Sequence, residues 1–321
     1  MKINLKNISK LLILFLTTTF LYAQPTITSF TPTSGPVGTI VTINGTGFNT
    51  TAANNIVWFG ATNATVSSAS ATSLTVTVPV GATYQPITVL NITTGLIAQS
   101  AKPFVVSFGG SGITDNSFLP KVDFTTGTQP YSVAIGDIDG DGKSDLAVAN
   151  ASSNTVSVFR NISTSGSIST SSFATKVDFA TGAAPISVAI GDIDGDGKSD
   201  LAVANWFSAT VSVFRNTSTS GSITTSSFAT KVDFAPGSYP SSVAIGDIDG
   251  DGKSDLAVAN ASSNTVSVFR NISTSGSIST SSFSAKVDFT TGSNPRSVAI
   301  GDLDGDGKSD LAVANYNSNT V

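Results

Sequence analysis

The chain has 321 residues, enough for about two domains, and 40% of them are hydrophobic, so a sizeable core can form. Charged residues make up only 12% and the formal net charge is −5, which provides no electrostatic basis for binding nucleic acid or an anionic membrane. The sequence contains no cysteine, so disulfides cannot stabilise the fold.

Residues 1–23 have the pattern of a secretory signal peptide. Lysines begin the segment, the apolar stretch 11–21 follows, and Ala23 provides a small residue before a cleavage site ahead of Gln24. The apolar stretch is too short, and too rich in threonine, for a membrane anchor. We therefore expect a secreted or cell-surface protein whose mature chain does not insert into a membrane.

Residues 24–106 alternate short Val/Ile/Thr runs with turn residues. The segments T-I-V-T-I and L-T-V-T-V place apolar and polar residues alternately, as strands with one buried face require. Their spacing predicts an antiparallel sandwich, and no residue in it suggests chemistry. Residues 107–116 (S-F-G-G-S-G-I-T-D-N) have the composition of a flexible linker.

The beginning of this sandwich resembles a known family. The segment P-T-I-T-S-F-T-P-T-S-G-P-V-G-T-I-V-T-I-N-G-T-G-F, followed by V-W-F-G and L-T-V-T-V-P, is similar to an IPT/TIG domain. The resemblance implies an immunoglobulin-like fold in residues 24–106, acting as a spacer or a partner-binding unit.

The rest of the chain, residues 117–321, is repetitive. The string D-I-D-G-D-G-K-S-D begins at Asp137, Asp192 and Asp247, and it returns at Asp302 with Leu303 in place of isoleucine, so the period is 55 residues. Each unit contains four apolar runs, which in the first copy are residues 131–136, 146–149, 155–160 and 173–179. Four short strands per repeat predict β-propeller blades, and the alternative of a parallel β-helix would need shorter repeats.

The aspartate string has the ligand order of a calcium loop. Carboxylates occupy positions 1, 3, 5 and 9, Gly142 occupies position 6, and Lys143 at position 7 would offer its backbone carbonyl while its side chain faces solvent. Position 12 is Val148 instead of a bidentate Glu, so the loop is not an EF-hand. Magnesium and zinc fit less well, because magnesium retains its waters and zinc prefers His and Cys ligands. An aspartate-rich turn without metal would suffer repulsion among its carboxylates.

The string G-D-I-D-G-D-G-K-S-D-L-A-V-A-N resembles the FG-GAP/VCBS repeat of integrin-α-like propellers. The resemblance implies one structural calcium ion per repeat, four in this chain. Secreted modules of this type bind calcium with dissociation constants on the order of 10⁻⁴–10⁻³ M. The predicted ligands are Asp137, Asp139, Asp141, Lys143 and Asp145; Asp192, Asp194, Asp196, Lys198 and Asp200; Asp247, Asp249, Asp251, Lys253 and Asp255; and Asp302, Asp304, Asp306, Lys308 and Asp310.

The repeats differ from one another mainly in two loops, which strand direction places on the face opposite the aspartate loops. Exposed aromatic residues and an arginine in such loops are typical anchors for an extracellular protein or glycan partner. Neutral drift in unconstrained loops is the alternative. The candidate anchors are Tyr131, Trp206, Phe207, Tyr239, Arg296 and Tyr316. The nearly identical S-T-S-G-S loops, by contrast, are interpreted as inert connectors.

These patterns predict an all-β, non-catalytic protein: an immunoglobulin-like sandwich followed by propeller blades, serving calcium-dependent recognition or adhesion. The alternatives are an extracellular spacer, or the accessory part of a larger secreted enzyme that continues beyond Val321. Residues 118–124 are expected to form a lone fourth strand before the first repeat. The final repeat lacks the S-V-F-R-N of earlier copies, so we expect a longer propeller, of seven blades if it follows the family.

Overall fold

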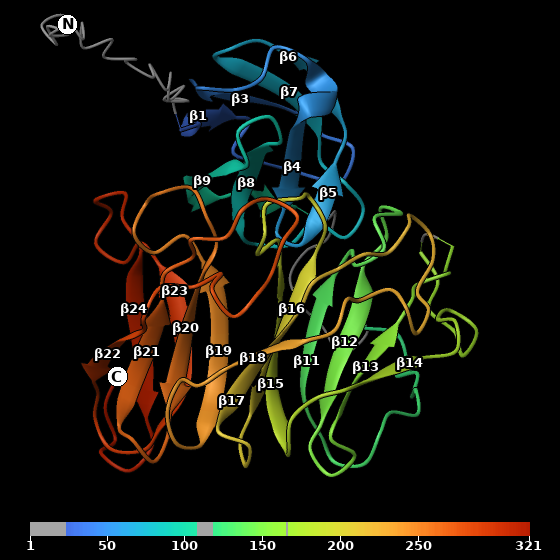
Figure 1. Cartoon of the computed structure of the whole chain (residues 1–321). Helices are drawn as coiled ribbons and strands as arrows, with labels where there is room; N and C mark the ends of the chain where they lie inside the picture. Colours follow the sequence, from blue (N-terminus) through green and yellow to red (C-terminus); the bar gives the residue numbers. More distant parts are fainter. Residues whose placement is uncertain (1–23, 108–117, 165) are drawn as a thin grey trace, which may run out of the picture.

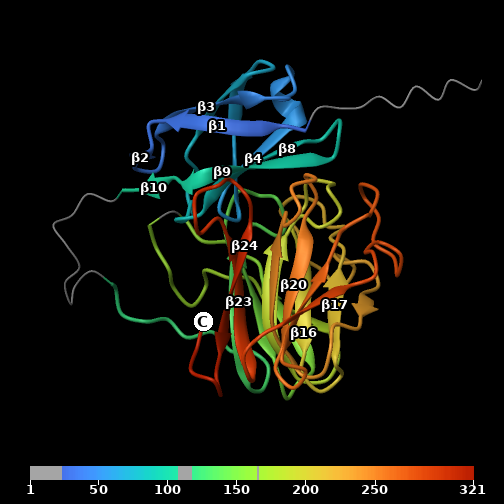
Figure 2. The same cartoon turned by 90° about the vertical axis from the view of Figure 1, so that its left-hand side faces the viewer.

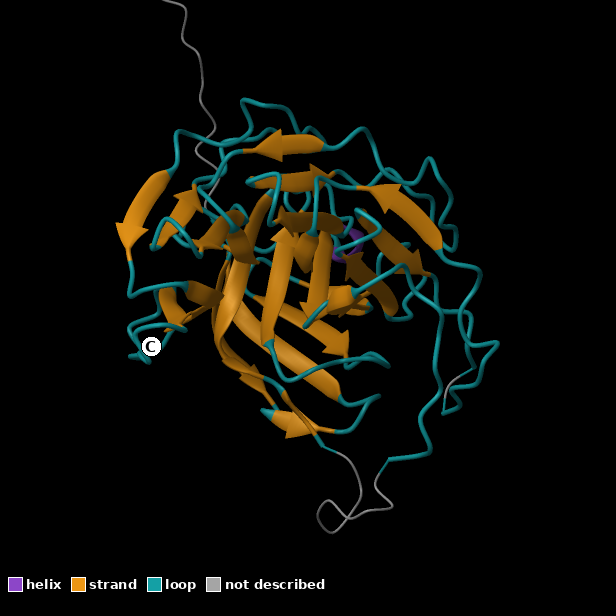
Figure 3. Cartoon of the chain, turned by 90° about the horizontal axis from the view of Figure 1, so that it is seen from below, coloured by secondary structure: helices purple, strands orange, loops and turns teal. Residues whose placement is uncertain are grey.

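Strands account for nearly all the regular structure of the chain, as the alternating segments predict. The computed structural model describes residues 24–107, 118–164 and 166–321, and within them the single helical turn is the 3₁₀ segment η1 (Ala52–Asn54). Figure 3 shows the predominance of strands from below. The prediction of an all-β protein is confirmed.

The first ten strands build an immunoglobulin-like module. They are β1 (Thr26–Thr31), β2 (Ser34–Gly35), β3 (Ile40–Thr46), β4 (Asn55–Phe59), β5 (Thr62–Ala64), β6 (Val66–Ala69), β7 (Ser73–Thr77), β8 (Pro86–Asn91), β9 (Leu96–Pro103) and β10 (Val105–Val106). Two four-stranded sheets, ordered β1-β3-β7-β6 and β5-β4-β8-β9, face each other, and β2 pairs with β10. Alternate residues such as Val41, Val57 and Val89 are fully buried between the sheets, as their period of two predicts.

The first three repeats form four-stranded blades, and the fourth contributes a two-stranded sheet, called blade 4 below. Blade 1 contains β11 (Pro130–Gly136), β12 (Asp145–Asn150), β13 (Thr155–Phe159) and β14 (Val177–Ala180); blade 2 contains β15 (Pro185–Gly191), β16 (Asp200–Asn205), β17 (Thr210–Phe214) and β18 (Val232–Phe234); blade 3 contains β19 (Pro240–Gly246), β20 (Asp255–Asn260), β21 (Thr265–Phe269) and β22 (Val287–Thr290); blade 4 contains β23 (Pro295–Gly301) and β24 (Asp310–Asn315). The strands of each blade are antiparallel and lie in chain order.

The fourth apolar run of each repeat is only partly a strand. In blade 1 the run was predicted to span 173–179, whereas β14 begins at Val177. Phe173 instead forms an isolated bridge with Asn161, and the register shifts by one residue before Val177 pairs with Val158. This irregularity interrupts the ladder and shortens the strand.

The blades stack on one another side by side. Strand β11 contacts β15, β15 contacts β19, and β19 contacts β23. Core clusters combine consecutive blades, since Ile138 and Ala147 of blade 1 pack with Val188 and Leu201 of blade 2. Every residue of β16 and β20 is buried, as expected for strands covered on both faces.

The stack is an open arc in the described part of the chain. Val133 on β11 is 59% exposed, whereas its counterpart Val188 in blade 2 is 6% exposed because blade 1 covers it. No described sheet closes onto β11. The segment 118–124 is not a strand, so the prediction of a lone fourth strand there is wrong. It runs beside blade 1 with Phe124 packed against Phe173, but it lacks a strand partner in the described residues.

The immunoglobulin-like module sits over one end of the blades, as Figures 1 and 2 both show. Contacts identify this end as the one that carries the aspartate loops, because the N–H of Asp137 donates to the carbonyl of Ala61 at 3.2 Å. The variable loops lie at the opposite end. Each blade therefore carries its aspartate loop at the end nearest the module and its variable loops at the opposite end.

Candidate metal centres

The first carboxylate of each aspartate loop organises its backbone. In repeat 1, Gly140 N–H donates to Asp137 Oδ1 at 2.8 Å and Gly142 N–H donates to Asp137 Oδ2 at 2.9 Å. The other three repeats have the same pair of bonds. Gly142 at position 6 has a φ of 86°, a left-handed conformation that favours glycine and lets the loop turn sharply there.

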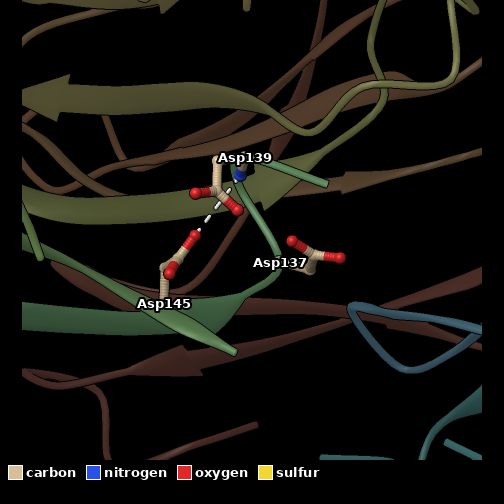
Figure 4. A group of neighbouring side chains, drawn as sticks. All are labelled: Asp137, Asp139 and Asp145. Atoms are coloured by element: carbon tan, nitrogen blue, oxygen red, sulfur yellow. Dashed lines mark hydrogen bonds between the residues drawn. The ribbon is translucent and has the colours of Figure 1, made fainter. Parts of the chain in front are cut away.

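Carboxylate oxygens converge to within 4.8 Å of one another in all four repeats. In the first two repeats the converging groups occupy positions 1, 3 and 9, as Figure 4 shows for Asp137, Asp139 and Asp145. In the last two repeats they occupy positions 1, 3 and 5. The clusters of repeats 2, 3 and 4 are Asp192, Asp194 and Asp200; Asp247, Asp249 and Asp251; and Asp302, Asp304 and Asp306, respectively. The predicted carboxylate ligands that lie outside these clusters are Asp141, Asp196, Asp255 and Asp310.

The carboxylate at position 9 joins the loop to the third strand. Asp145 is fully buried; its Oδ2 accepts the N–H of Ile138 at 2.9 Å and its Oδ1 accepts the N–H of Asn161 at 2.7 Å. Asp200 and Asp255 make the corresponding bonds. This aspartate is therefore already oriented by the backbone before any ion is considered.

Burial and crowding make these carboxylates unusually basic. Burial is the largest cause, and neighbouring carboxylates add to it. Together they raise the pKa of Asp145 and Asp192 to about 7 and the pKa of Asp137, Asp194 and Asp255 to about 6. The same causes raise the pKa of the fully buried Asp200 well above its ordinary value. A divalent cation would supply the positive charge that this site otherwise lacks.

The donor set fits a hard divalent cation. Asp194 Oδ2 is a buried oxygen that has no hydrogen-bond partner among the described residues, and it belongs to the converging cluster of repeat 2. An unpaired buried carboxylate oxygen is costly unless a cation or a donor meets it. All candidate ligands are oxygens, which matches calcium. The clusters become more exposed toward repeat 4, where Asp304 and Asp306 are open to solvent.

Arginines that pair with the loop aspartates were not predicted from the sequence. The Nε of Arg160 donates to Asp139 Oδ2 at 2.9 Å, and Arg270 pairs with both Asp249 and Asp251. Each arginine directly follows the third strand of its repeat, in the string S-V-F-R-N, and this recurrence was the available signal. The guanidinium supplies part of the countercharge at position 3.

The S-T-S-G-S loops at 218–222 and 273–277 are not inert connectors, so that interpretation is wrong for these two. Each of them folds back on the aspartate loop of the preceding repeat. Ser220 Oγ donates to the carbonyl of Gly140 at 2.9 Å, and Gly221 N–H donates to the carbonyl of Asp139 at 3.2 Å. The loop at 273–277 repeats both contacts on repeat 2 through Ser275 and Gly276.

The lysines behave differently from the expectation of a solvent-facing side chain. Lys198 Nζ donates to the carbonyl of Ser218 at 2.9 Å, and Lys253 Nζ donates to the carbonyl of Ser273 at 2.8 Å. The side chain of Lys143 is exposed, as expected. That the backbone carbonyls of Lys143, Lys198, Lys253 and Lys308 serve as ligands remains a prediction.

The outer face of the module sheet β5-β4-β8-β9 covers three of the four loops. Trp58, Leu90 and Ile97 form a buried apolar cluster on this face, with Ile56 packed beside them. The N–H of Ile97 donates to the carbonyl of Gly252 at 2.8 Å, and a side chain in place of Gly197 would lie 2.5 Å from Ile56 Cδ1. In repeat 1, Thr62 Oγ1 lies 3.2 Å from Ser144 Oγ.

The candidate partner residues are grouped at the opposite end of the blades. The ring of Trp206 lies 5.1 Å from that of Tyr239, and the Phe207 ring lies 6.3 Å from Tyr239. Arg296 lies over the rings of both Trp206 and Tyr316. Tyr131 stands apart on blade 1, exposed and without an aromatic neighbour in the described chain. The two variable loops adjoin, since Trp206 N–H donates to the carbonyl of Ala184 at 2.9 Å.

Comparison with known families agrees with this architecture. The model of the FG-GAP-like repeat matches residues 137–203, 193–258 and 247–313, and the model of the IPT/TIG domain matches residues 25–116. The matched repeats span more than half of the chain. The protein is thus a repeat-blade protein with an immunoglobulin-like module, and it belongs to the FG-GAP-like repeat family with an IPT/TIG domain at its N-terminal end.

Solved structures provide only distant similarity. An auxiliary nutrient binding protein from Bacteroides thetaiotaomicron is 12% identical, with a TM-score of 0.26 over 86% of this chain and 92% of its own. A protein of unknown function from the same organism is 16% identical, with a TM-score of 0.32 over 91% and 68%. A functionally unknown protein from Desulfotomaculum acetoxidans is 16% identical, with a TM-score of 0.34 over 77% and 66%. No curated protein matches the chain.

In residues 24–107, 118–164 and 166–321, no helix has the length and apolar character needed to cross a membrane. The expected signal peptide, residues 1–23, and most of the expected linker lie outside the described residues.

Proposed function

We propose that the protein is a calcium-binding, extracellular recognition protein, in which the aspartate loops stabilise the blades and the variable loops engage a protein or glycan partner. The observation that carries this proposal is the separation of two loop sets. Convergent carboxylates occupy one end of the blades, and grouped aromatic rings with Arg296 occupy the other. Secretion rests on the signal-peptide pattern of residues 1–23.

The residues at positions 1, 3, 5 and 9 would hold calcium, together with the position 7 carbonyls. The ion would supply positive charge to a loop that is otherwise closed by hydrogen bonds and by an arginine in repeats 1 and 3 or Lys308 in repeat 4. Its role is structural, since the loops in repeats 1 to 3 lie against the module and those of repeats 1 and 2 also accept hydrogen bonds from the S-T-S-G-S loops.

A non-catalytic role is supported by the fate of the remaining aspartates. Asp123, Asp178, Asp233 and Asp288 each pair with the lysine two residues before them. They are therefore engaged in ion pairs; Asp115 lies outside the described residues. The alternative, an accessory region of a larger secreted enzyme, shares this non-catalytic role for the chain itself.

Binding to panels of extracellular matrix proteins and glycans tests the proposal. We expect binding that disappears on chelation, because the blades lose their loop ions, and that weakens in Trp206→Ala. Alanine occupies the equivalent positions 151 and 261, so this variant should fold. The proposal fails if no panel member binds, or if binding is indifferent to both changes.

A further inference from the structure

A pocket of about 320 Å³ opens at the ends of blades 2, 3 and 4, away from the aspartate loops. Its walls include Trp206, Tyr239, Asn264, Asn294, Arg296 and Asn317. Its volume lies at the lower end of the range for small-ligand sites, on the order of 300–1,000 Å³. The pocket is therefore large enough for one small unit of a longer ligand.

The hollow arises from an alternation of large and small side chains. The residue that follows the second strand is Ala151, Trp206, Ala261 and Tyr316 in the four repeats. Ala261 lies in the pocket wall, and the rings of the neighbouring repeats stand on either side of it. The repeat differences thus create a site between blades that the repeat itself does not contain.

Arg296 is held in place by aromatic rings and has no internal counterion. Its guanidinium carbon lies 4.9 Å from the centre of the Trp206 ring and 5.6 Å from that of Tyr316. No ion pair to Arg296 exists within the described residues, and no carboxylate lines the pocket. Contact through its flat faces leaves the N–H groups at its edge free for two parallel bonds to a carboxylate.

The remaining walls suit a ligand that carries many hydroxyl groups. Asn264, Asn294 and Asn317 contribute amides, and Ser262 and Ser293 contribute hydroxyls. Amides and hydroxyls both donate and accept hydrogen bonds, as sugar hydroxyls require. Beside the rings, the one aliphatic side chain in the pocket wall is that of Ala261, so an apolar peptide side chain would find little to pack against.

Tyr239 occupies a backbone position that does not favour a tyrosine. Its φ is 56°, and the equivalent residues Gln129, Ala184 and Asn294 have φ values of 55°, 53° and 58°. The turn therefore imposes a left-handed conformation, which asparagine tolerates better than a bulky aromatic residue. Such strained positions are concentrated at ligand sites. The turn alone therefore does not account for an aromatic ring against Trp206 at this position.

We propose that this pocket binds a uronic acid unit of an acidic polysaccharide, with its carboxylate on Arg296 and its ring and hydroxyls against Tyr239, Trp206 and the amides. The inference rests on the proposed recognition function and adds the class of ligand. Charge complementarity selects the acidic sugar, because Arg296 is the one charged side chain in the pocket wall.

The test is a calorimetric titration of the calcium-saturated protein with trigalacturonate. We expect saturable binding that weakens at least tenfold in Arg296→Ser and in Trp206→Ala. Both variants introduce the residue found at the same position of another repeat, Ser241 and Ala261, so their folding should be preserved. Ile186→Ser changes the same position on blade 2, outside the pocket wall, and should leave the affinity unchanged.

Two further measurements test the charge of the ligand and the contribution of the Tyr239 ring. The methyl ester of trigalacturonate removes the charge and should bind at least tenfold more weakly. Tyr239→Asn should weaken binding about fivefold while leaving the melting temperature equal or higher, a combination that a purely structural tyrosine would not produce. If Arg296→Ser binds as tightly as wild type, trigalacturonate is held elsewhere, for example through calcium, and the inference is wrong.

Two outcomes distinguish this inference from the proposed function. If triglutamate binds as tightly as trigalacturonate, the ligand is an acidic peptide and the assignment to a sugar fails. If trigalacturonate does not bind while another panel member binds in a Trp206-dependent manner, recognition by this end stands and the uronic acid inference fails. If neither binds, both fail.

Discussion

At the residue scale, the buried aspartates are better suited to binding an ion than to standing alone. Asp200 is fully buried, and its carboxylate accepts the N–H groups of Ile193 and Asn216 at 2.9 and 2.7 Å. Its raised pKa shows that the ionised form is destabilised by burial and by neighbouring carboxylates. The hydrogen bonds orient the oxygens, and a cation would provide the missing charge.

We expect Asp200→Asn to remove one calcium site. Calorimetry should then count one ion fewer per chain than in wild type, because asparagine lacks the charge that a hard cation requires. At a calcium concentration of about 100 times the dissociation constant, each site contributes about 2.7 kcal/mol of stability, which the variant should lose. Asp178→Asn makes the same change outside the loops and should leave the calcium stoichiometry intact. An unchanged stoichiometry in Asp200→Asn would contradict the assignment.

Protons and calcium compete for these carboxylates, which predicts a pH dependence. Without calcium, the folded-state pKa values of about 6 to 7 for Asp137, Asp145 and Asp192 exceed the ordinary 3.8. The folded state therefore binds more protons than the unfolded state between these limits, and this stability is fully present below pH 3.8 and lost as the pH rises through 6 to 7. Calcium binds the ionised form, so its contribution grows over the same interval.

Melting curves with calcium and with chelator check this dependence. We expect the chelated protein to melt at a lower temperature at about pH 7.5 than at about pH 5.5, and the difference between the two samples to widen as the pH rises. A calcium-induced shift that stays constant over this range would mean that the titrating carboxylates are not the ligands.

At the element scale, consecutive blades are joined by asparagines at the end of the third strand. The side-chain amide of Asn216 donates at 2.7 Å to the carbonyl of Ser199 in its own repeat and at 2.7 Å to the carbonyl of Ile138 in the preceding repeat. Asn271 repeats the arrangement with Ser254 and Ile193. The aspartate loop of one blade is thus fixed by a residue of the next.

We expect Asn216→Ala to destabilise the protein by about 2–4 kcal/mol, since two buried carbonyls lose their donor. Asn161→Ala is the matched control, because the side-chain amide of Asn161 donates to Ser144 alone and has no preceding blade in the described chain. It should cost about half as much. Urea unfolding monitored by circular dichroism measures both, and equal losses would show that the bond between blades contributes nothing.

At the scale of the whole molecule, calcium binding and the position of the immunoglobulin-like module should be coupled. The module contacts the loops of repeats 1, 2 and 3 through Ala61, Ile56 and Ile97, whereas the described contacts do not include the loop of repeat 4. Without ions, repulsion among the loop carboxylates would alter the surface against which this apolar face packs. Chelation should therefore loosen the module from the blades.

Hydrogen exchange measured by mass spectrometry tests this coupling. We expect chelation to increase exchange at least fivefold in residues 90–98, which lie against the loops of repeats 2 and 3. Asp194→Asn should increase exchange there in the presence of calcium, whereas Asp304→Asn, in the uncovered loop, should not. Equal protection with and without calcium would show that the module docks independently of the ions.

The sequence by itself determined the elements and the chemistry of the loops. A period of 55 residues and four apolar runs specify blades, and alternation specifies the sandwich, because both follow from local patterns of burial. The carboxylate spacing likewise specifies an oxygen-rich loop. Comparison of the repeats showed that positions 206, 239 and 296 vary, but it did not show that Trp206, Tyr239 and Arg296 contact one another.

Only the tertiary structure decided which of these groups meet. It shows that Arg160 pairs with Asp139 and that two S-T-S-G-S loops donate hydrogen bonds to the preceding blade. It also shows that the module lies against the aspartate loops of repeats 1 to 3. It also divides the clusters between positions 1, 3 and 9 and positions 1, 3 and 5. These contacts join residues far apart in the chain, and their formation depends on how blades and module pack, which no local pattern encodes.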